Sequence, residues 1–579
     1  IQRLQAFADH EARQRSGTGF LWNDHAIAAR VPVLSRFWAL MREQPEIVDR
    51  SGATLLALVA RSGRLLAKPD HFTVRTNHGV MQNLALLQIA AAFPGLPEAS
   101  AWRSIALDRL QLQLNFYISS EGFVLEHSAE YHALGLELLE MAVRLCKLNA
   151  VEPPPGLIDA TNRANAVLHA LIRPDGTLPL FGNTNAGVQF RLPAEMADGS
   201  RALSSRPPPH PLPPPGNRLF PLSGYAIWWQ GDHDRQTPSQ TVIAWAKHDG
   251  HGHKHADEMS VLFWSGGTDW ITNTGYWPYG DRHTDTAYSW SASNAIHEVS
   301  EPFAAVRTTR LLASADSARI RMLALERVAA TGARLQRQVL QIGSDLLVIL
   351  DFAENAKSGV ETIWTFAPAL TLKPLHSGSE FLSSAAEDGR RLTISFAPTA
   401  RRPTHHRGSE QPWAGWVVIG GKPQPADALR VSAPGPSSAT AAVFRTAAIA
   451  HPASEQHLEF TPTPDPDNWS LSMVIEDRRI RLVRSGSEIT ATGLGGSNQE
   501  PETSQLTLIA PPDAGRQTLA LEKAYASAVA AFPPWRDLFA YRLKLTFAVL
   551  AIAVAIEMLY FAITTWLKRR NRESHPKLM

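Results

Sequence analysis

The histidines of this 579-residue chain are concentrated in one stretch. Six of the 21 His lie within the 50 residues from His248 to His297, where an even distribution would place about two. In HDGHGHKHADEMS, an extended backbone would point His251, His253 and His255 to one side, because strand side chains alternate between faces. Such imidazoles can bind a metal ion or exchange protons, and the plain alternative is a solvated histidine-rich loop. We expect a metal site or an acid/base site here.

Several common chemical motifs are missing from the sequence. It contains no G-x-x-x-x-G-K-[ST] phosphate loop, no H-E-x-x-H zinc helix and no G-x-S-x-G nucleophile elbow. The single cysteine, Cys146, excludes an internal disulfide and a CxxC redox pair. Lys plus Arg is 56 against 54 Asp plus Glu, so the net charge of +2 gives no broad basic surface for nucleic acid. The sequence therefore argues against nucleotide, serine-hydrolase and nucleic-acid chemistry.

Two kinds of secondary structure lie on either side of a proline-rich segment. Seven prolines between residues 207 and 215 predict an extended linker over 207–217. Before it, segments such as VMQNLALLQIAAAF and YHALGLELLEMAVRLCKL have the apolar spacing of amphipathic helices. After it, short runs such as TVIAWAKH, DLLVILDF and RIRLVRS are separated by turn residues, as antiparallel strands are. We predict an all-helical domain over 1–206 and a mostly antiparallel β domain over 218–535.

An apolar stretch near the C-terminus predicts a membrane anchor. Residues 545–567 are long enough to cross a hydrocarbon core of about 30 Å and contain one charged residue, Glu557. The basic residues of 568–579 outnumber those just before the stretch, so the positive-inside rule places this tail in the cytoplasm. A buried core helix is the alternative. We expect a single-pass protein of a bacterial inner membrane, with its large body in the periplasm.

Six segments, taken together, resemble the heparinase II/III-like polysaccharide lyases. In the first half these are WNDHAIAAR at 22–30, TNHGVMQNLAL from Thr76, GFVLEHSAEYHALGLELL from Gly122 and PDGTLPLFGNTN from Pro174. In the second half they are FPLSGYAIWW from Phe220 and HGHKHADEMSVLFWSGGTDWITNTG from His251. The resemblance implies a multidomain α+β fold with an incomplete α/α toroid and an antiparallel β-sandwich, followed here by the predicted transmembrane helix.

The resemblance also implies cleavage of a uronic-acid-containing polysaccharide by β-elimination. That reaction removes the C5 proton of the uronate, so it needs a partner for the carboxylate, a base for the proton and an acid for the leaving oxygen. Similarity to the family places Asn77 at the carboxylate, with His78 beside it. It also matches Tyr131 and His253 to the catalytic tyrosine and histidine. A helix-capping Asn and an ordinary half-buried helical Tyr are the alternatives for Asn77 and Tyr131.

Three further residues are candidates for substrate binding. At helical spacing, His127 and Tyr131 share one face, which would line a cleft. Tyr279 and Tyr288 are both candidates for a tyrosine that the β domain contributes, and their spacing does not choose between them.

Many members of the family bind a structural zinc ion through His, Asp and His, so the resemblance implies a possible Zn²⁺ site. His255 and His297 match two of the ligands. The third position is Asn273, and a neutral amide is a poor zinc ligand. Either Asp257 or Asp269 would substitute for it, or a hydrogen-bond network would replace the ion.

The polymer stays undetermined, and two other functions stay open. The near-neutral charge argues against a heavily sulfated ligand that needs a broad basic groove. A glycoside hydrolase on the same scaffold would need paired carboxylates, whereas a non-catalytic glycan-binding or exopolysaccharide export factor would need no acid/base groups. We predict a membrane-anchored polysaccharide lyase that acts on an acidic polysaccharide.

Overall fold

The computed structural model describes residues 1–14, 19–190, 213–231, 237–249, 251–375, 378–448, 458–475, 478–494, 502–511 and 515–532. The chain divides into two compact units. Unit 1 contains Ile1–Gln113, Arg144–Pro154 and Lys523–Met579, and unit 2 contains Leu114–Val143 and Pro155–Glu522. The predicted membrane stretch 545–567 and the tail 568–579 lie outside the described residues. Among the helices that are described, none combines the length and the apolar character needed to cross a membrane.

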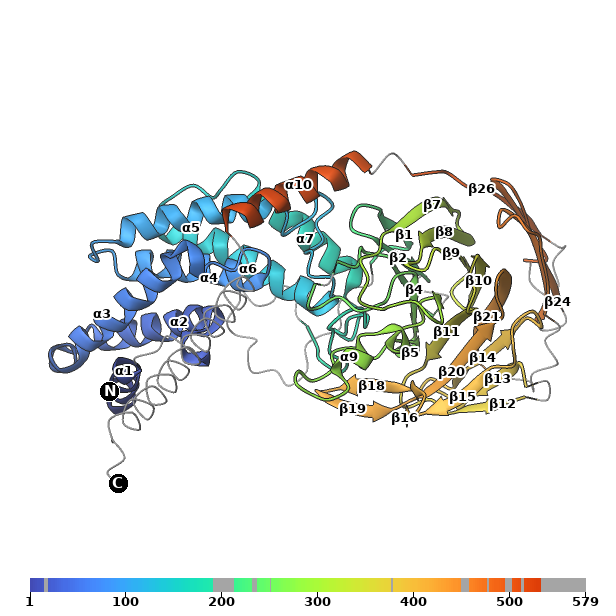
Figure 1. Ribbon diagram of the computed structural model, residues 1–579, viewed down its shortest axis with the longest axis horizontal. Helices are drawn as coiled ribbons and strands as arrows, with labels where there is room; N and C mark the ends of the chain where they lie inside the picture. The colour runs from blue at the N-terminus through green and yellow to red at the C-terminus, as the bar shows by residue number, and fades with distance from the viewer. Residues whose placement is uncertain are drawn as a thin grey trace, which may run out of the picture. The chain divides into compact units, whose positions relative to one another are not determined.

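Unit 1 is helical, as the sequence predicts for the N-terminal region (Figure 1). Its elements are α1 (Gln2–Arg13), η1 (Phe20–Trp22), α2 (Asp24–Met41), α3 (Pro45–Ala67), η2 (Pro69–His71), α4 (Asn77–Ala92), α5 (Ala99–Leu114) and the ends of α6 (Ala129–Leu148) and α10 (Gly515–Ala531). α2 packs against α3 and α4. The buried Glu11 of α1 pairs with Arg30 of α2 at 2.8 Å and with Arg61 of α3 at 2.7 Å, which ties the three helices together.

Unit 2 consists mainly of antiparallel sheets, as predicted for the second half of the chain. The first sheet has the order β1 (Gly216–Phe220), β2 (Tyr225–Gln230), β3 (Ser239–Ala244), β4 (Ser260–Ser265), β5 (Thr268–Ile271). An eight-stranded sheet has the order β12 (Leu372–Pro374), β13 (Glu380–Ser383), β14 (Arg390–Phe396), β21 (Ser438–Ala448), β10 (Leu346–Glu354), β9 (Arg334–Ile342), β8 (Ile320–Val328), β7 (Thr309–Asp316). A third sheet has the order β22 (Glu459–Pro462), β23 (Asn468–Ile475), β24 (Arg478–Ser485), β25 (Glu488–Thr492), β26 (Thr503–Thr507).

Smaller elements complete the described part of unit 2. A four-stranded sheet has the order β15 (Thr404–Arg407), β20 (Asp427–Ala433), β11 (Val360–Thr365), β6 (His297–Glu298). Two hairpins pair β16 (Ser409–Glu410) with β17 (Trp413–Ala414) and β18 (Trp416–Ile419) with β19 (Lys422–Pro425). The helical elements are the start of α6, α7 (Leu157–Leu171), α9 (Thr284–Ala287), η4 (Trp290–Ala292) and the start of α10.

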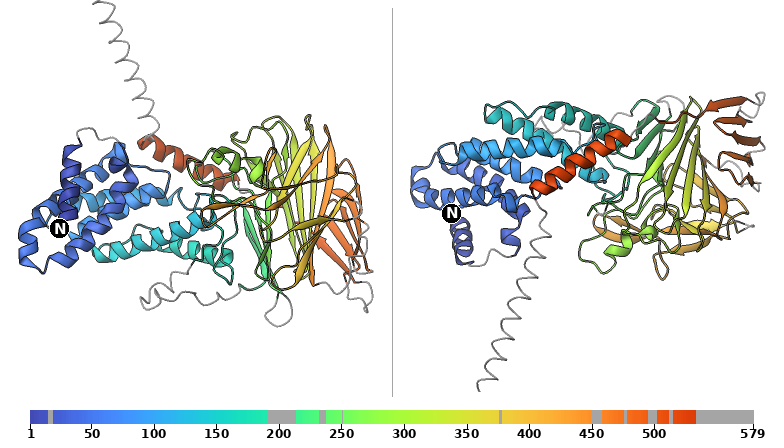
Figure 2. Two further views of the ribbon diagram at one scale, coloured as in Figure 1. Left: turned by 90° about the horizontal axis from the view of Figure 1, so that it is seen from below. Right: turned by 45° about the horizontal axis from the view of Figure 1, so that its top comes forward.

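The eight-stranded sheet is covered on both faces by other sheets (Figure 2). Leu323 of β8 shares a core with Trp228 of β2, whereas the neighbouring Met322 shares a separate core with Leu471 of β23. Because side chains alternate along a strand, a strand with both faces covered is buried at nearly every position, as β8 is. The predicted sandwich therefore carries a third sheet, β22 to β26, which the sequence analysis did not distinguish.

The division predicted at 207–217 stays a prediction. Residues 191–212 lie outside the described residues, and β1 begins at Gly216. Residues 114–143, which include the start of α6, and helix α7 belong to the same compact unit as the sheets. Two of the proposed catalytic residues, Tyr131 and His253, therefore lie in one unit.

Candidate active site

A buried amide organises the site of unit 2. Asn183 belongs to residues 182–185, Gly-Asn-Thr-Asn, which we call the GNTN segment. Its side chain is fully buried, and its Nδ2 lies 3.1 Å from Nδ1 of His253 and 3.0 Å from the hydroxyl of Tyr279. Its Oδ1 lies 2.7 Å from Nε2 of His255, which donates to it. One side chain thus fixes both histidines and the tyrosine.

The same segment places Tyr131 beside His253. Tyr131 lies in the first turn of α6, and the hydroxyl of Thr184 accepts hydrogen bonds from the backbone N–H groups of Ala129 at 3.1 Å and Glu130 at 3.4 Å. Thr184 therefore caps this helix from a distant part of the sequence. The rings of Tyr131 and His253 stack with their centroids 3.6 Å apart and their planes 19° from parallel.

Gly182 is required because two backbones approach it closely. Its φ is +55°, and a Cβ atom there would lie 2.1 Å from the carbonyl oxygen of His127 and 2.7 Å from that of His253. Any side chain would push these segments apart. At the other end of the segment, the carboxylate of Glu130 accepts hydrogen bonds from the backbone and side-chain nitrogens of Asn185, both at 2.8 Å.

A hydrogen-bonded path connects Tyr131 to His253. The hydroxyls of Tyr131, Tyr276 and Tyr279 are hydrogen-bonded to one another, and the hydroxyl of Tyr279 lies 3.1 Å from Nδ1 of His253. Burial, followed by the neighbouring Tyr279 and Tyr276, raises the pKa of Tyr131 above its usual value. Tyr131 is therefore protonated at neutral pH, while Tyr279 is 57% exposed at the surface. The path can carry protons between the two stacked rings.

The expectation of an extended backbone at His251, His253 and His255 is wrong. Residues 251–258 form turns before β4, and the backbone N–H of His253 donates to Nδ1 of His251 at 3.3 Å. The ammonium of Lys254 turns inward and donates to the carbonyl of His255 at 2.9 Å, which fixes a turn in place of a strand. The ring of His255 stacks on Tyr288, with ring centroids 4.3 Å apart.

The helical-spacing argument for His127 is also wrong. α6 begins at Ala129, and His127 precedes it with a φ of +59°. The hydroxyl of Ser128 donates to the carbonyl of Asn183 at 2.6 Å, so the chain is held by the GNTN segment before the helix begins. The ring of His127 packs edge-on against His251, with centroids 5.8 Å apart. Its role in substrate binding stays a prediction.

The structure distinguishes the two tyrosines between which the spacing did not choose. Tyr279 contacts His253 directly. Tyr288 turns inward, where its hydroxyl donates to the carbonyl of Trp277 at 3.2 Å and burial raises its pKa above the usual value. Tyr288 therefore supports the ring of His255, and Tyr279 is the better candidate for contact with a substrate.

Asn77 and His78 begin helix α4 in unit 1. The cap of this helix is Thr76, whose hydroxyl accepts the N–H of His78 at 3.3 Å, so Asn77 is not the cap. Nδ1 of His78 lies 3.1 Å from Oδ2 of Asp24, to which the hydroxyl of Thr73 also donates. Although burial acts to raise it, the hydrogen bonds from His78 and Thr73 bring the pKa of Asp24 to about 2. A charged Asp24 holds a proton on Nδ1 of His78 and so orients the ring.

The candidate zinc ligands fit a metal ion poorly. Within the described ranges, no group of three or more His, Cys, Asp or Glu side chains is arranged to hold a metal. Nε2 of His255 is taken by Asn183, and the amide of Asn273 donates to the hydroxyl of Ser260 at 2.9 Å. His297 lies flat on Trp290, with centroids 5.2 Å apart and planes 2° from parallel.

Neighbouring charges oppose a metal ion as well. Burial lowers the pKa of His255 and of His297 to about 3, and the cations Lys254 and Arg327 act in the same direction on the respective rings. The two aspartates considered as substitutes already have partners. Asp257 pairs with Lys254, and Asp269 pairs with Arg173 at 2.8 Å. The zinc ion stays a prediction that metal analysis can test.

Two sequence profiles of one family match the chain. The profile described as Heparinase II/III N-terminus matches residues 1–204, and the profile described as Heparinase II/III-like, C-terminal matches residues 212–447. The chain belongs to the heparinase II/III-like family. It is a polysaccharide lyase. No match was found among curated protein sequences.

Solved structures share the fold. Heparinase III superposes with a TM-score of 0.67 at 15% identity, over 87% of this chain and 80% of that chain. Heparan sulfate lyase HepC from Pedobacter heparinus superposes with a TM-score of 0.62 at 14% identity, over 86% of this chain and 79% of that chain. A mutant of HepC from the same organism superposes with a TM-score of 0.64 at 14% identity, over 83% of this chain and 78% of that chain. These likenesses show that the helical region and the antiparallel sheets form a multidomain α+β fold of this family.

The sequence analysis missed three residues of the site. Asn183 and Thr184 lie in PDGTLPLFGNTN, a segment that carries the resemblance but whose residues were given no roles. Tyr276 directly follows the segment that ends at Gly275. The available signal was a run of small polar residues directly after an apolar stretch. Such a run also predicts an ordinary turn, and only the fold shows that it meets His253.

Proposed function

We propose that this lyase cleaves a uronate-containing polysaccharide by β-elimination through Tyr131, Tyr279 and His253. The observation that carries the proposal is the hydrogen-bonded path from Tyr131 through Tyr279 to Nδ1 of His253. β-Elimination removes one proton from C5 and adds one to the leaving oxygen, and this path connects a proton donor to a proton acceptor. A glycoside hydrolase would need a free pair of carboxylates, whereas Glu130, the carboxylate next to Tyr131, is bonded to Asn185.

Each proton has an assigned place in the proposed reaction. Tyr279 takes the C5 proton as its own hydroxyl proton passes to Nδ1 of His253. The amide of Asn183 donates to that nitrogen, so the neutral ring carries its proton on Nε2 and Nδ1 can accept. The electron pair of the C5–H bond forms the C4–C5 double bond, and the pair of the breaking C4–O bond stays on oxygen. That oxygen takes the proton of Tyr131, which His253 then restores through Tyr279.

Asn77 is the residue that we propose for the substrate carboxylate. A carboxylate that is held by hydrogen bonds stabilises the carbanion-like charge that develops as the C5 proton leaves. An amide is a suitable donor, and the capping role that would explain Asn77 structurally belongs to Thr76. His78, oriented by the charged Asp24, is proposed as its companion.

The Asn77→Ala protein should lose turnover with little loss of stability. Removing an oxyanion-type donor costs roughly a hundredfold in rate. The matched control is Thr76→Ala, which removes the cap of the same helix and should cost about 1 kcal/mol of stability with turnover changed by a few fold at most. Turnover rates and thermal melting temperatures of both variants show whether Asn77 acts in the reaction or in the helix. The reverse pattern, a slow Thr76→Ala and a fast Asn77→Ala, would assign Asn77 a structural role.

We further propose that residues 545–567 anchor the enzyme in a bacterial inner membrane, with its body in the periplasm. The proposal is supported by the apolar length of the stretch and by the basic residues of 568–579. A cytoplasm-active reporter fused after Met579 should be active. A reporter at this position that is active only in the periplasm would contradict the orientation and leave the lyase chemistry untouched.

The substrate is proposed to be an acidic polysaccharide that is not heavily sulfated, exopolysaccharides included. HepC is named for heparan sulfate, a polymer that contains uronate, and the net charge of +2 in this chain gives no broad basic groove for dense sulfate. Alginate, glucuronan and heparan-like polymers together form a suitable test panel.

The test is to incubate the purified protein with this panel and follow ultraviolet absorbance. Only elimination creates the conjugated unsaturated uronate, so absorbance should rise with at least one polymer. New reducing ends without absorbance would favour the glycoside hydrolase. Binding without any cleavage would favour a glycan-binding or export factor.

A further inference from the structure

We propose that Lys254 and Asp257 are positioning residues whose ion pair orders the histidine loop, taking the place that a metal ion would have. The histidine loop is defined here as residues 251–258. The inference rests on the proposed function, because the loop carries His253. It goes beyond that function by naming the cation that holds the loop in this chain.

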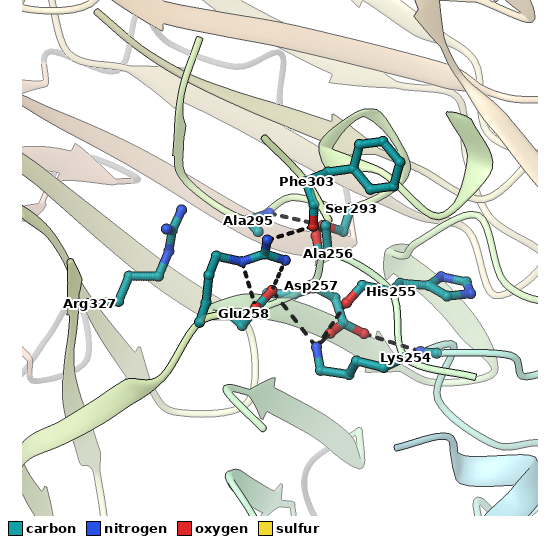
Figure 3. A network of polar contacts seen from close by, with 12 residues as sticks. Lys254, His255, Ala256, Asp257, Glu258, Ser293, Ala295, Phe303 and Arg327 are labelled. Atoms are coloured by element: carbon teal, nitrogen blue, oxygen red, sulfur yellow. Dashed lines mark hydrogen bonds and ion pairs between the residues drawn. The ribbon is translucent and has the colours of Figure 1, made fainter. Parts of the chain in front are cut away.

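The ammonium of Lys254 is enclosed by oxygen atoms. Its side chain is 1% exposed. It bonds to Oδ1 of Asp257, donates to the carbonyl of His255 at 2.9 Å and lies 3.8 Å from Oε2 of Glu258 (Figure 3). A buried cation with this many oxygen partners draws the turns of the loop around itself, as a bound metal ion does.

Asp257 passes this constraint to the residues that hold His253. Its Oδ2 accepts the backbone N–H of Gly182 at 3.1 Å. The next residue is Asn183, whose side chain contacts His253 and whose backbone N–H donates to the carbonyl of His253 at 3.1 Å. The ion pair therefore joins the histidine loop to the GNTN segment, one residue away from the amide that orients the imidazole.

Glu258 and Arg307 anchor the other end of the loop. Both oxygens of the fully buried Glu258 are bonded to Arg307, at 2.8 and 3.3 Å. Arg307 lies over the ring of Trp290 at 4.3 Å, and its backbone pairs with that of His248 at 3.0 and 2.9 Å. Two cations thus balance two carboxylates, so the network is neutral without a metal ion.

The buried ion pair of Lys254 and Asp257 is better explained by a role in positioning His253 than by a contribution to stability. A buried ion pair is weak support for stability, because apolar residues of similar volume are often as good. What an ion pair adds is directional contact, here between two segments that together hold His253. A divalent ion at His255 would instead lie beside the ammonium of Lys254 and be repelled by it.

The first experiment measures metal and chelator effects on the full-length protein purified without chelator. We expect far less than one zinc per chain, with melting temperature and turnover unchanged by EDTA. One equivalent of zinc whose removal lowers either quantity would overturn the proposal.

The second experiment removes the ion pair. Lys254→Met alone leaves Asp257 without its cation and can fail to fold, so the deciding variant is Lys254→Met/Asp257→Asn, whose amide oxygen can still accept from Gly182. We expect a folded protein whose kcat falls roughly tenfold to a hundredfold with KM little changed. The control is Arg321→Met/Asp316→Asn, a pair 2.7 Å apart on β7 and β8, which should keep the parent's kcat.

Hydrogen exchange separates this proposal from the proposed function. Peptides covering 251–258 and 182–185 should exchange faster in the Lys254→Met/Asp257→Asn protein than in the parent and the control, whether or not a substrate has been found. Unchanged exchange in both peptides, or a kcat equal to the parent's, would overturn the positioning role. A parent that makes no unsaturated product would overturn the proposed function alone.

Discussion

The Tyr131→Phe protein is expected to turn over its substrate roughly a hundredfold or more slowly than the parent, with KM and thermal stability nearly unchanged. The change deletes the one hydroxyl that supplies a proton to the leaving oxygen. It keeps the ring that stacks on His253 with centroids 3.6 Å apart, so packing should persist. Initial rates at saturating polymer, followed by ultraviolet absorbance, measure the effect.

Tyr117→Phe is the matched control for this variant. Tyr117 lies in the same compact unit, is buried, and its hydroxyl has no hydrogen-bond partner within the described residues. The same chemical change there should leave turnover at the parent's rate. Equal losses in both variants would indicate a general packing effect, and a Tyr131→Phe protein as fast as the parent would remove Tyr131 from the acid role.

The His253→Ala protein is expected to lose turnover by a similar factor, roughly a hundredfold or more, and to regain part of it with added imidazole. The substitution removes the nitrogen that accepts the proton of Tyr279 and leaves a space against the face of Tyr131 that a free imidazole can fill. Turnover is measured as a function of imidazole concentration at constant pH and ionic strength.

Two further variants test whether the rescue by imidazole is specific to the loss of His253. Imidazole cannot replace a phenol, so Tyr131→Phe should not respond to it. His405→Ala, on β15 and paired with Asp427 at 3.4 Å, should retain the parent's turnover. A His253→Ala protein that is slow but insensitive to imidazole, with a lowered melting temperature, would point to a structural role for this ring.

The sequence predicted the two kinds of secondary structure because each has its own apolar period. α6 follows the three- and four-residue spacing of YHALGLELLEMAVRLCKL. VMQNLALLQIAAAF forms the helix α4 as predicted, but it is buried at every position from Gln82 to Leu87, so the amphipathic pattern expected for it is wrong. The third sheet was not separable, because strands that cover the outer face of a sheet have the same alternation as strands that cover its inner face. Thr184 as the cap of α6 was equally hidden, since capping is usually local and here it comes from a residue far along the chain.

The sequence predicted individual residues of the candidate site but not how they are arranged in space. The resemblance supplied Tyr131 and His253, which the structure brings into contact. The rule that strand side chains alternate gave the wrong backbone for the histidine loop, because a pattern of apolar and polar residues does not show that the Lys254 ammonium is buried. Asn183 was missed for a related reason. In the structure it is a buried amide with several hydrogen-bond partners, but in the sequence it looks like an ordinary turn residue.

Elimination and hydrolysis differ in the fate of one water molecule, and this difference tests the proposed chemistry most directly. The polymer that gives rising absorbance should be digested in water labelled with heavy oxygen, reduced at once, and analysed by mass spectrometry. The proposed reaction predicts products that are lighter by one water than hydrolysis products, with an unsaturated end and no solvent oxygen at the new reducing end. Saturated products that carry one heavy oxygen from the solvent would contradict β-elimination.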